Sequence, residues 1–191
     1  GVWTENGLVS IETIESGSRV YTYDPVQRRW VLRKVLQVQI HEFRGEMLSI
    51  SSNDTAIQVT GNHPVWVLSG KNLDRRPAAT EIGYTERRET PRGRWLEARS
   101  LLPGDLLFGI NGRPLAIANI ARQAVETTVY NLKVEGLHTY LVGRDGILVH
   151  NKGSAEMAAP TAMEEKAAAQ PEEQTLIVPA EGWNTEEYSR I

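Results

Sequence analysis

The sequence contains no cysteine. This absence excludes a disulfide framework, a thiolate metal site and a cysteine nucleophile within these 191 residues. The chain has four histidines, but no carboxylate or second histidine stands at ligand spacing near His63 or His150. We therefore expect no metal site and no cofactor.

Long hydrophobic runs are also absent, so the sequence predicts no membrane-spanning segment. The basic residues are scattered and do not alternate with aromatic residues, which argues against a nucleic-acid partner. The chain starts at Gly1 without a methionine or a signal-like segment. We expect these residues to come from the interior of a longer protein, and we expect that protein to be a monomer.

Charge and composition change after Asn151. The part up to Asn151 carries 18 basic and 16 acidic residues, whereas the part from Lys152 carries 3 and 8. Residues 153–182 are rich in alanine, glutamate and proline without a sustained period, which is typical of a disordered linker. Aromatic residues return in 183–191, which predicts the start of a truncated downstream domain.

Short segments of alternating apolar and polar residues, separated by turns, fill most of the chain up to Asn151. Asn6-Gly7 stands between two such segments and predicts a hairpin. We expect separate strands over 29–40 and 47–50, a short helical turn at 95–98, and a long mobile surface loop over 69–94. The pattern predicts an all-β domain of mostly antiparallel strands.

The segment Val149-His150-Asn151-Lys152 can support a reaction of the backbone itself. An asparagine amide can attack its own carbonyl carbon, forming a succinimide and releasing the next residue as an amine. Histidine has a pKa near neutrality, so His150 could protonate the departing amine or polarise the carbonyl. A His-Asn pair on its own more often just closes a strand, so the rest of the chain must decide.

Three segments follow one another in a distinctive order: Thr60-Gly61-Asn62-His63, then 129–134 with 137–143, and finally Val149-His150-Asn151. This ordered set resembles the later motifs of Hint domains, the hedgehog and intein superfamily, and most closely those of bacterial pretoxin-type and intein-like members. The opening residues resemble the segment that follows the nucleophile in this family. The resemblance therefore covers Gly1 to about Lys152, which we predict to be a Hint autoprocessing domain without its N-terminal nucleophile segment.

The resemblance implies a horseshoe-like all-β fold and autocatalytic rearrangement of the flanking peptide bonds, a self-cleaving, single-turnover activity on the chain's own polypeptide. By motif, Thr60 and His63 assist the N-terminal acyl shift, and His138 lies near the second scissile bond. Asn151 cyclises with help from His150. We expect His63, His138, His150 and Asn151 to converge near the first residues of the domain.

Two departures from the family pattern limit the expected reaction. The chain starts at a point equivalent to a few residues after the family's N-terminal nucleophile and contains no cysteine. Residue 152 is lysine, whereas full splicing needs cysteine, serine or threonine there. The sequence therefore predicts cleavage between Asn151 and Lys152 without efficient splicing, which releases the downstream part.

Other interpretations stay open at this point. An inactive Hint-like module could serve as a β scaffold or interaction domain in a larger bacterial protein, and the missing nucleophile favours this. A β barrel that binds a metal or a small molecule is a third possibility, without a converging polar cluster to support it. Singly, Thr60, His63 and His138 could each be structural, and His41 is expected at the surface.

The last eight residues, 184–191, resemble the segment that precedes the domain in bacterial von Willebrand factor type A proteins. This resemblance implies that the module is inserted near the front of a secreted or surface adhesion-type protein and controls its release.

Overall fold

A computed structural model describes residues 1–52, 55–79 and 93–151. The described residues form β-strands and short 3-10 turns, and no α-helix occurs among them. The elements are β1 (Val2–Thr4), β2 (Gly7–Val9), η1 (Ile11–Thr13), β3 (Arg19–Asp24), β4 (Arg29–Ser52), β5 (Thr55–Thr60), β6 (Pro64–Ser69), η2 (Leu73–Arg75), β7 (Arg94–Glu97), η4 (Ala98–Ser100), β8 (Leu106–Phe108), η5 (Ile110–Gly112), β9 (Pro114–Ala116), β10 (Asn119–Val134), β11 (Thr139–Val142) and β12 (Ile147–His150).

All recorded strand pairs are antiparallel, so the predicted all-β class is confirmed. The hairpin at Asn6-Gly7 is present, since Thr4 pairs with Gly7 across β1 and β2. The main path of the 12-stranded sheet has the order β10-β4-β3-β1-β11-β12-β6-β8-β9. Strands from both ends of the chain, β1, β11 and β12, therefore meet in the middle of the sheet.

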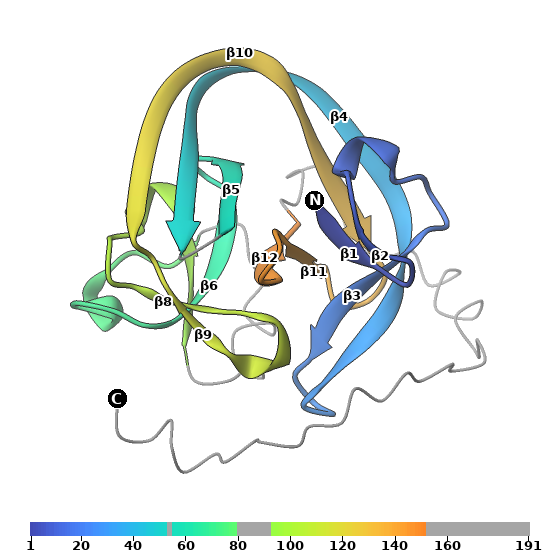
Figure 1. The fold of residues 1–191 in the computed structure, drawn as a ribbon, viewed down its shortest axis with the longest axis horizontal. Helices are drawn as coiled ribbons and strands as arrows, with labels where there is room; N and C mark the ends of the chain where they lie inside the picture. The colour runs from blue at the N-terminus through green and yellow to red at the C-terminus, as the bar shows by residue number, and fades with distance from the viewer. Residues whose placement is uncertain (53–54, 80–92, 152–191) are drawn as a thin grey trace, which may run out of the picture.

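The two longest strands, β4 and β10, pair over 35–51 and 119–134 and form a curved ribbon. Figure 1 shows this ribbon arching over the molecule and joining the lobe of β1 to β3 with the lobe of β5 to β9, while β11 and β12 lie between them. The expectation of separate strands over 29–40 and 47–50 is thus wrong. In the middle of the ribbon, many residues on both faces are exposed to solvent. The sequence there therefore lacks the alternation of apolar and polar residues that marks a half-buried strand.

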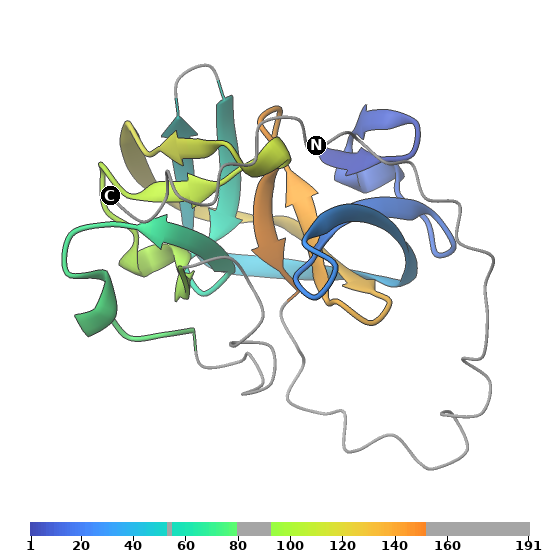
Figure 2. The same ribbon diagram turned by 90° about the horizontal axis from the view of Figure 1, so that it is seen from below.

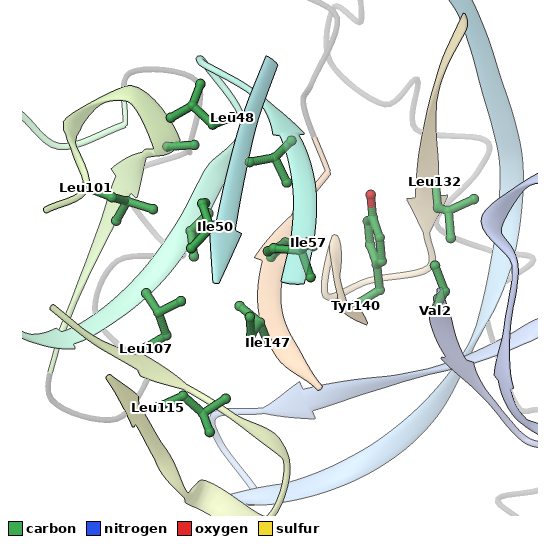
Figure 3. Packing of buried hydrophobic residues seen from close by; sticks show 14 of the residues in the cluster. Val2, Leu48, Ile50, Ile57, Leu101, Leu107, Leu115, Leu132, Tyr140 and Ile147 are labelled. Atoms are coloured by element: carbon green, nitrogen blue, oxygen red, sulfur yellow. The ribbon is translucent and has the colours of Figure 1, made fainter. Parts of the chain in front are cut away.

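The larger hydrophobic core spans both lobes. Figure 3 shows Leu48, Ile50 and Leu107 on one side of this core, and Val2 with Leu132 on the other. A second, aromatic cluster contains Trp30, Trp66, Trp95 and Phe108, together with Leu148 of β12 and other residues. Both clusters include residues of β12 and β11, so the hairpin that carries the histidine–asparagine pair is held from two sides.

The segment expected as a loose loop over 69–94 is packed against the domain as far as Ala79. Arg76 donates to both carboxylate oxygens of Asp105 at 2.7 Å, and Asp105 also accepts from the backbone N–H of Leu102. Ala79 is buried, and its N–H donates to the carbonyl of Trp95. Residues 80–92 lie outside the described part of the chain.

The expected helical turn at 95–98 is also wrong. Trp95 and its neighbours form β7, in which Trp95 pairs with Trp66 of β6, and the 3-10 turn η4 starts only at Ala98. Pairing with β6 buries Trp95 and Leu96, and this tertiary contact outweighs the weak local preference for a helix. The predicted linker over 153–182 and the predicted downstream domain over 183–191 lie outside the described residues.

Candidate functional site

The histidine–asparagine pair is delivered by the hairpin of β11 and β12. The two strands pair from Val142 with Ile147 to Thr139 with His150, and two glycines with positive φ close the turn between them. At Gly143, with φ of 74°, a Cβ atom would lie 2.6 Å from Ile57, so both the backbone and the space require glycine.

Neighbours on both edges enclose β12. β11 pairs with one edge and β6 with the other, through Val149 and Val65. The exposed fractions of His150 and Asn151 are therefore only 5% and 7%. Beside His150, the hydroxyl groups of Thr139 and Thr22 form a buried hydrogen bond that ties β11 to β3. The pair at the end of β12 thus has little contact with water.

The imidazole of His150 contacts the backbone of the next residue. Its Nδ1 lies 2.6 Å from the carbonyl oxygen of Asn151. A carbonyl oxygen only accepts hydrogen bonds, so Nδ1 must be the protonated nitrogen in this contact. The carbonyl belongs to the peptide bond that follows Asn151, and a hydrogen bond to its oxygen makes its carbon more electrophilic.

The backbone of His138 also contacts Asn151. It has φ of 55°, in the left-handed region, and its carbonyl accepts a 2.7 Å hydrogen bond from the N–H of Asn151. The ring centroids of His138 and His150 are 6.2 Å apart. His138, His150 and Asn151, which the sequence named separately, therefore lie together.

Thr60 and His63 belong to the turn between β5 and β6. Thr60 Oγ1 donates to Asn62 Oδ1 at 3.0 Å, and the N–H of His63 donates to the carbonyl of Thr60. Val65 of β6 pairs with Val149 of β12 in antiparallel register. Two residues before Val65 and two residues after Val149, the same register places the backbone of His63 level with that of Asn151. His63 and Asn151 thus lie at the same end of β6 and β12.

Gly1 lies toward the opposite end of the β11–β12 hairpin. Its carbonyl accepts from the N–H of Gly143, and the next residue, Val2, pairs with Val142. Because Val142 is three residues from Thr139, the partner of His150, about 10 Å along β11 separates the two levels. Figure 2 shows the N-terminus at one end of this hairpin and β12 running away from it. The structure therefore brings His138, His150 and Asn151 together, whereas Gly1 lies apart from them.

A groove of about 1140 Å³ opens under the β4–β10 ribbon. Gly1, Thr60 and His63 all line it, whereas His138, His150 and Asn151 are not among the described residues that do. The residues expected to act at the N-terminal bond thus share an open groove with the first residue. Of the residues expected to act at the C-terminal bond, His150 and Asn151 are buried and His138 is half-buried.

Sequence reasoning missed two residues of this region. Tyr140 donates to Asn131 Oδ1, and Asn131 in turn donates to Gln39 on the ribbon; burial raises the pKa of Tyr140. Trp95 packs edge to face against His150, with ring centroids 5.4 Å apart. No signal in the sequence could show the contacts of Asn131 with Gln39 and of Trp95 with His150, because they join segments far apart in the chain. Within the described residues no cluster of three or more histidines or acidic residues could hold a metal ion.

Comparison with known proteins identifies similar domains. Residues 85–152 match the family model of the pretoxin HINT domain. The solved structure of a bacterial intein-like domain from Clostridium thermocellum is 28% identical with a TM-score of 0.62, covering 78% of this chain and 93% of that one. The chain has a Hint-type fold.

Two further structures share the Hint fold with this chain at lower identity. The DnaX mini-intein from Spirulina platensis has 22% identity and a TM-score of 0.56, with 78% of this chain and 94% of that one covered. An intein from a hyperthermophile has 17% identity and a TM-score of 0.53, with coverage of 70% and 71%. No significant match was found among curated protein sequences.

The Hint class implies a general capacity for autoprocessing, in which the domain acts on its own polypeptide. Among the described residues of this Hint domain, no helix has the length and apolar character needed to cross a membrane.

Proposed function

We propose that this Hint domain cleaves its own chain between Asn151 and Lys152 by cyclisation of Asn151, without efficient splicing. Nδ2 of Asn151 forms a bond to the carbonyl carbon of the same residue, and the bond from that carbon to the nitrogen of Lys152 breaks. A proton from Nδ2 ends on the departing amine. The products are a chain ending in a succinimide and a downstream part with a free α-amine, so no outside reagent is consumed.

The contact between His150 Nδ1 and the carbonyl oxygen of Asn151, at 2.6 Å, carries this proposal. Attack on that carbon builds negative charge on the oxygen, and a hydrogen-bond donor aimed at it stabilises the charge. His150 therefore acts first by polarising the carbonyl. The burial of both residues excludes water that would compete for the carbonyl carbon.

The hydrogen bond from Asn151 to the carbonyl of His138 supports a positioning effect, because it fixes the backbone on the amino side of the reacting residue. The nearby imidazole of His138 is the candidate donor of a proton to the leaving amine. Thr60 and His63 are assigned to the N-terminal bond, and the groove that they line is also lined by Gly1. Lysine at 152 provides no hydroxyl or thiol to accept an acyl group, so ligation is not expected.

Intact-mass measurement over days at neutral and mildly acidic pH tests the proposal. Wild-type protein should yield two fragments that together have the mass of the whole chain, and later one extra water as the succinimide hydrolyses. Asn151→Ala should remain whole, because alanine has no amide to cyclise, and Asn62→Ala, which alters another asparagine of the motifs, should still cleave at Asn151. If wild-type protein also remains whole, with or without a cysteine-containing segment restored before Gly1, the alternative of an inactive β scaffold replaces this proposal.

A further inference from the structure

The imidazole of His150 can rotate about two side-chain bonds, and its Nδ1 meets the carbonyl oxygen of Asn151 in only a narrow range of those rotations. The hydrogen bond to the carbonyl of Asn151 does not by itself fix the plane of the ring. Packing against the ring contributes to holding it in the orientation that polarises the carbonyl.

Trp95 is in position to hold the ring. Its centroid lies 5.4 Å from that of His150 with an interplanar angle of 80°, an edge-to-face arrangement within the favourable range for aromatic pairs. β6 separates β7, which carries Trp95, from β12, so the indole reaches across a strand to make this contact. The exposed fraction of Trp95 is only 3%.

Three contacts in turn fix Trp95. It pairs with Trp66 across β6 and β7, and the two indoles pack edge to face with centroids 5.0 Å apart. Its backbone carbonyl accepts a 3.0 Å hydrogen bond from the N–H of Ala79. Ala79 belongs to the same segment as Arg76, which is anchored by its buried ion pair with Asp105, so this segment also restrains the backbone of Trp95.

We propose that Trp95 is a positioning residue for self-cleavage, which holds the imidazole of His150 with Nδ1 toward the carbonyl of Asn151. This inference rests on the proposed cleavage at Asn151. Trp95 acts through His150 and takes no part in bond making. Losing the contact frees the ring to turn away, and a misplaced catalytic group reacts more slowly even when its chemistry is intact.

Cleavage kinetics give the first test. Trp95→Leu should slow release of the downstream part by ~10- to 100-fold, whereas Trp95→Phe, which keeps an aromatic ring, should restore most of the rate. Trp30→Leu is the matched control, because Trp30 is a buried indole of the same aromatic cluster that contacts Tyr23 and Phe108. Equal slowing by Trp95→Leu and Trp30→Leu would reduce the effect to general stability and overturn the proposal.

A second readout does not depend on cleavage. In the uncleavable Asn151→Ala chain, which keeps the backbone carbonyl, nitrogen NMR at a pH where the ring carries one proton should show that proton on Nδ1 of His150, with separate signals for the two ring nitrogens. Adding Trp95→Leu should average the two ring-nitrogen signals, and adding Trp30→Leu should leave them separate. An unchanged His150 spectrum with Trp95→Leu would overturn the positioning role. Absence of cleavage in wild-type protein would instead count against the proposed function, while this spectrum still decides the role of Trp95.

Discussion

At the scale of single residues, the proposed cleavage depends on one hydrogen bond, from His150 Nδ1 to the carbonyl oxygen of its own neighbour. Strand β12 ends at His150, so Asn151 lies just beyond the strand, and its carbonyl contacts the imidazole of the residue before it. His138, with left-handed backbone, supplies the carbonyl that holds Asn151 at this point.

Replacing His150 by alanine should slow cleavage at Asn151 by ~10²–10⁴-fold, the usual contribution of a positioned acid–base group. His41→Ala is the matched control, since His41 is exposed and outside the C-terminal pair. Time courses of fragment formation by mass spectrometry measure both variants. Similar rates for His150→Ala and wild-type protein would remove His150 from the mechanism.

A second prediction at this scale concerns Gly143. Gly143→Ala should destabilise the fold by about 1–3 kcal/mol, because alanine meets a positive φ there as well as the side chain of Ile57 at 2.6 Å. Gly136→Ala isolates the backbone cost, since Gly136 has φ of 69° with no atom within 4 Å of the added carbon. Urea unfolding should therefore show the larger loss for Gly143→Ala, and equal losses would show that Ile57 yields without cost.

At the scale of elements, the segment from Gly70 to Ala79 is joined to the domain by a buried ion pair. The side chains of Arg76 and Asp105 have exposed fractions of 12% and 1%, and the two are joined by two hydrogen bonds. Gly70 leaves the room for this pair, because a Cβ atom there would lie 2.1 Å from the Asp105 carboxylate. The pair thus positions the chain that leads back to Trp95.

Breaking this pair with Asp105→Ala should cost about 3–5 kcal/mol in the free energy of unfolding, because the guanidinium of Arg76 stays buried without its counter-charge. The matched control is Glu46→Ala, which breaks the exposed pair of Glu46 and Arg122 on the β4–β10 ribbon and should cost about 0–1 kcal/mol. Denaturant unfolding distinguishes the two. A loss for Asp105→Ala as small as that for Glu46→Ala would mean that water reaches Arg76 in the folded domain.

At the scale of the whole molecule, the sheet closes two lobes around the β11–β12 hairpin and spans them with the exposed β4–β10 ribbon (Figure 1). The middle of the ribbon, over 37–46 and 124–133, pairs only within itself among the described strands. Strands β11 and β12 have neighbours on both edges and buried side chains. Local stability should therefore differ sharply between these two parts.

Hydrogen exchange of the Asn151→Ala chain should show the middle of the ribbon exchanging faster than β12, because opening a two-stranded exposed ribbon disrupts few buried contacts. Residues 48–50 of β4, which are flanked by both β10 and β5, serve as an internal control and should exchange slowly. Protection of 37–46 equal to that of β12 would indicate a further strand or partner along the ribbon.

The sequence by itself determined the local features: the hairpin at Asn6-Gly7, the antiparallel β class, and the Val149-His150-Asn151 ending with the motifs that resemble Hint domains. These features depend on turn chemistry and on residue types at short spacing, which the local chain sets. The sequence could not reveal that β4 is one continuous strand, that Trp95 lies in a strand, or that the segment from Gly70 to Ala79 is anchored to the domain. Each of these is decided by a partner more than ten residues away, as in the pairing of Trp95 with Trp66. The surroundings of His150 are likewise decided by the tertiary structure, because β6, β11 and Trp95 enclose the end of β12 and come from distant parts of the sequence.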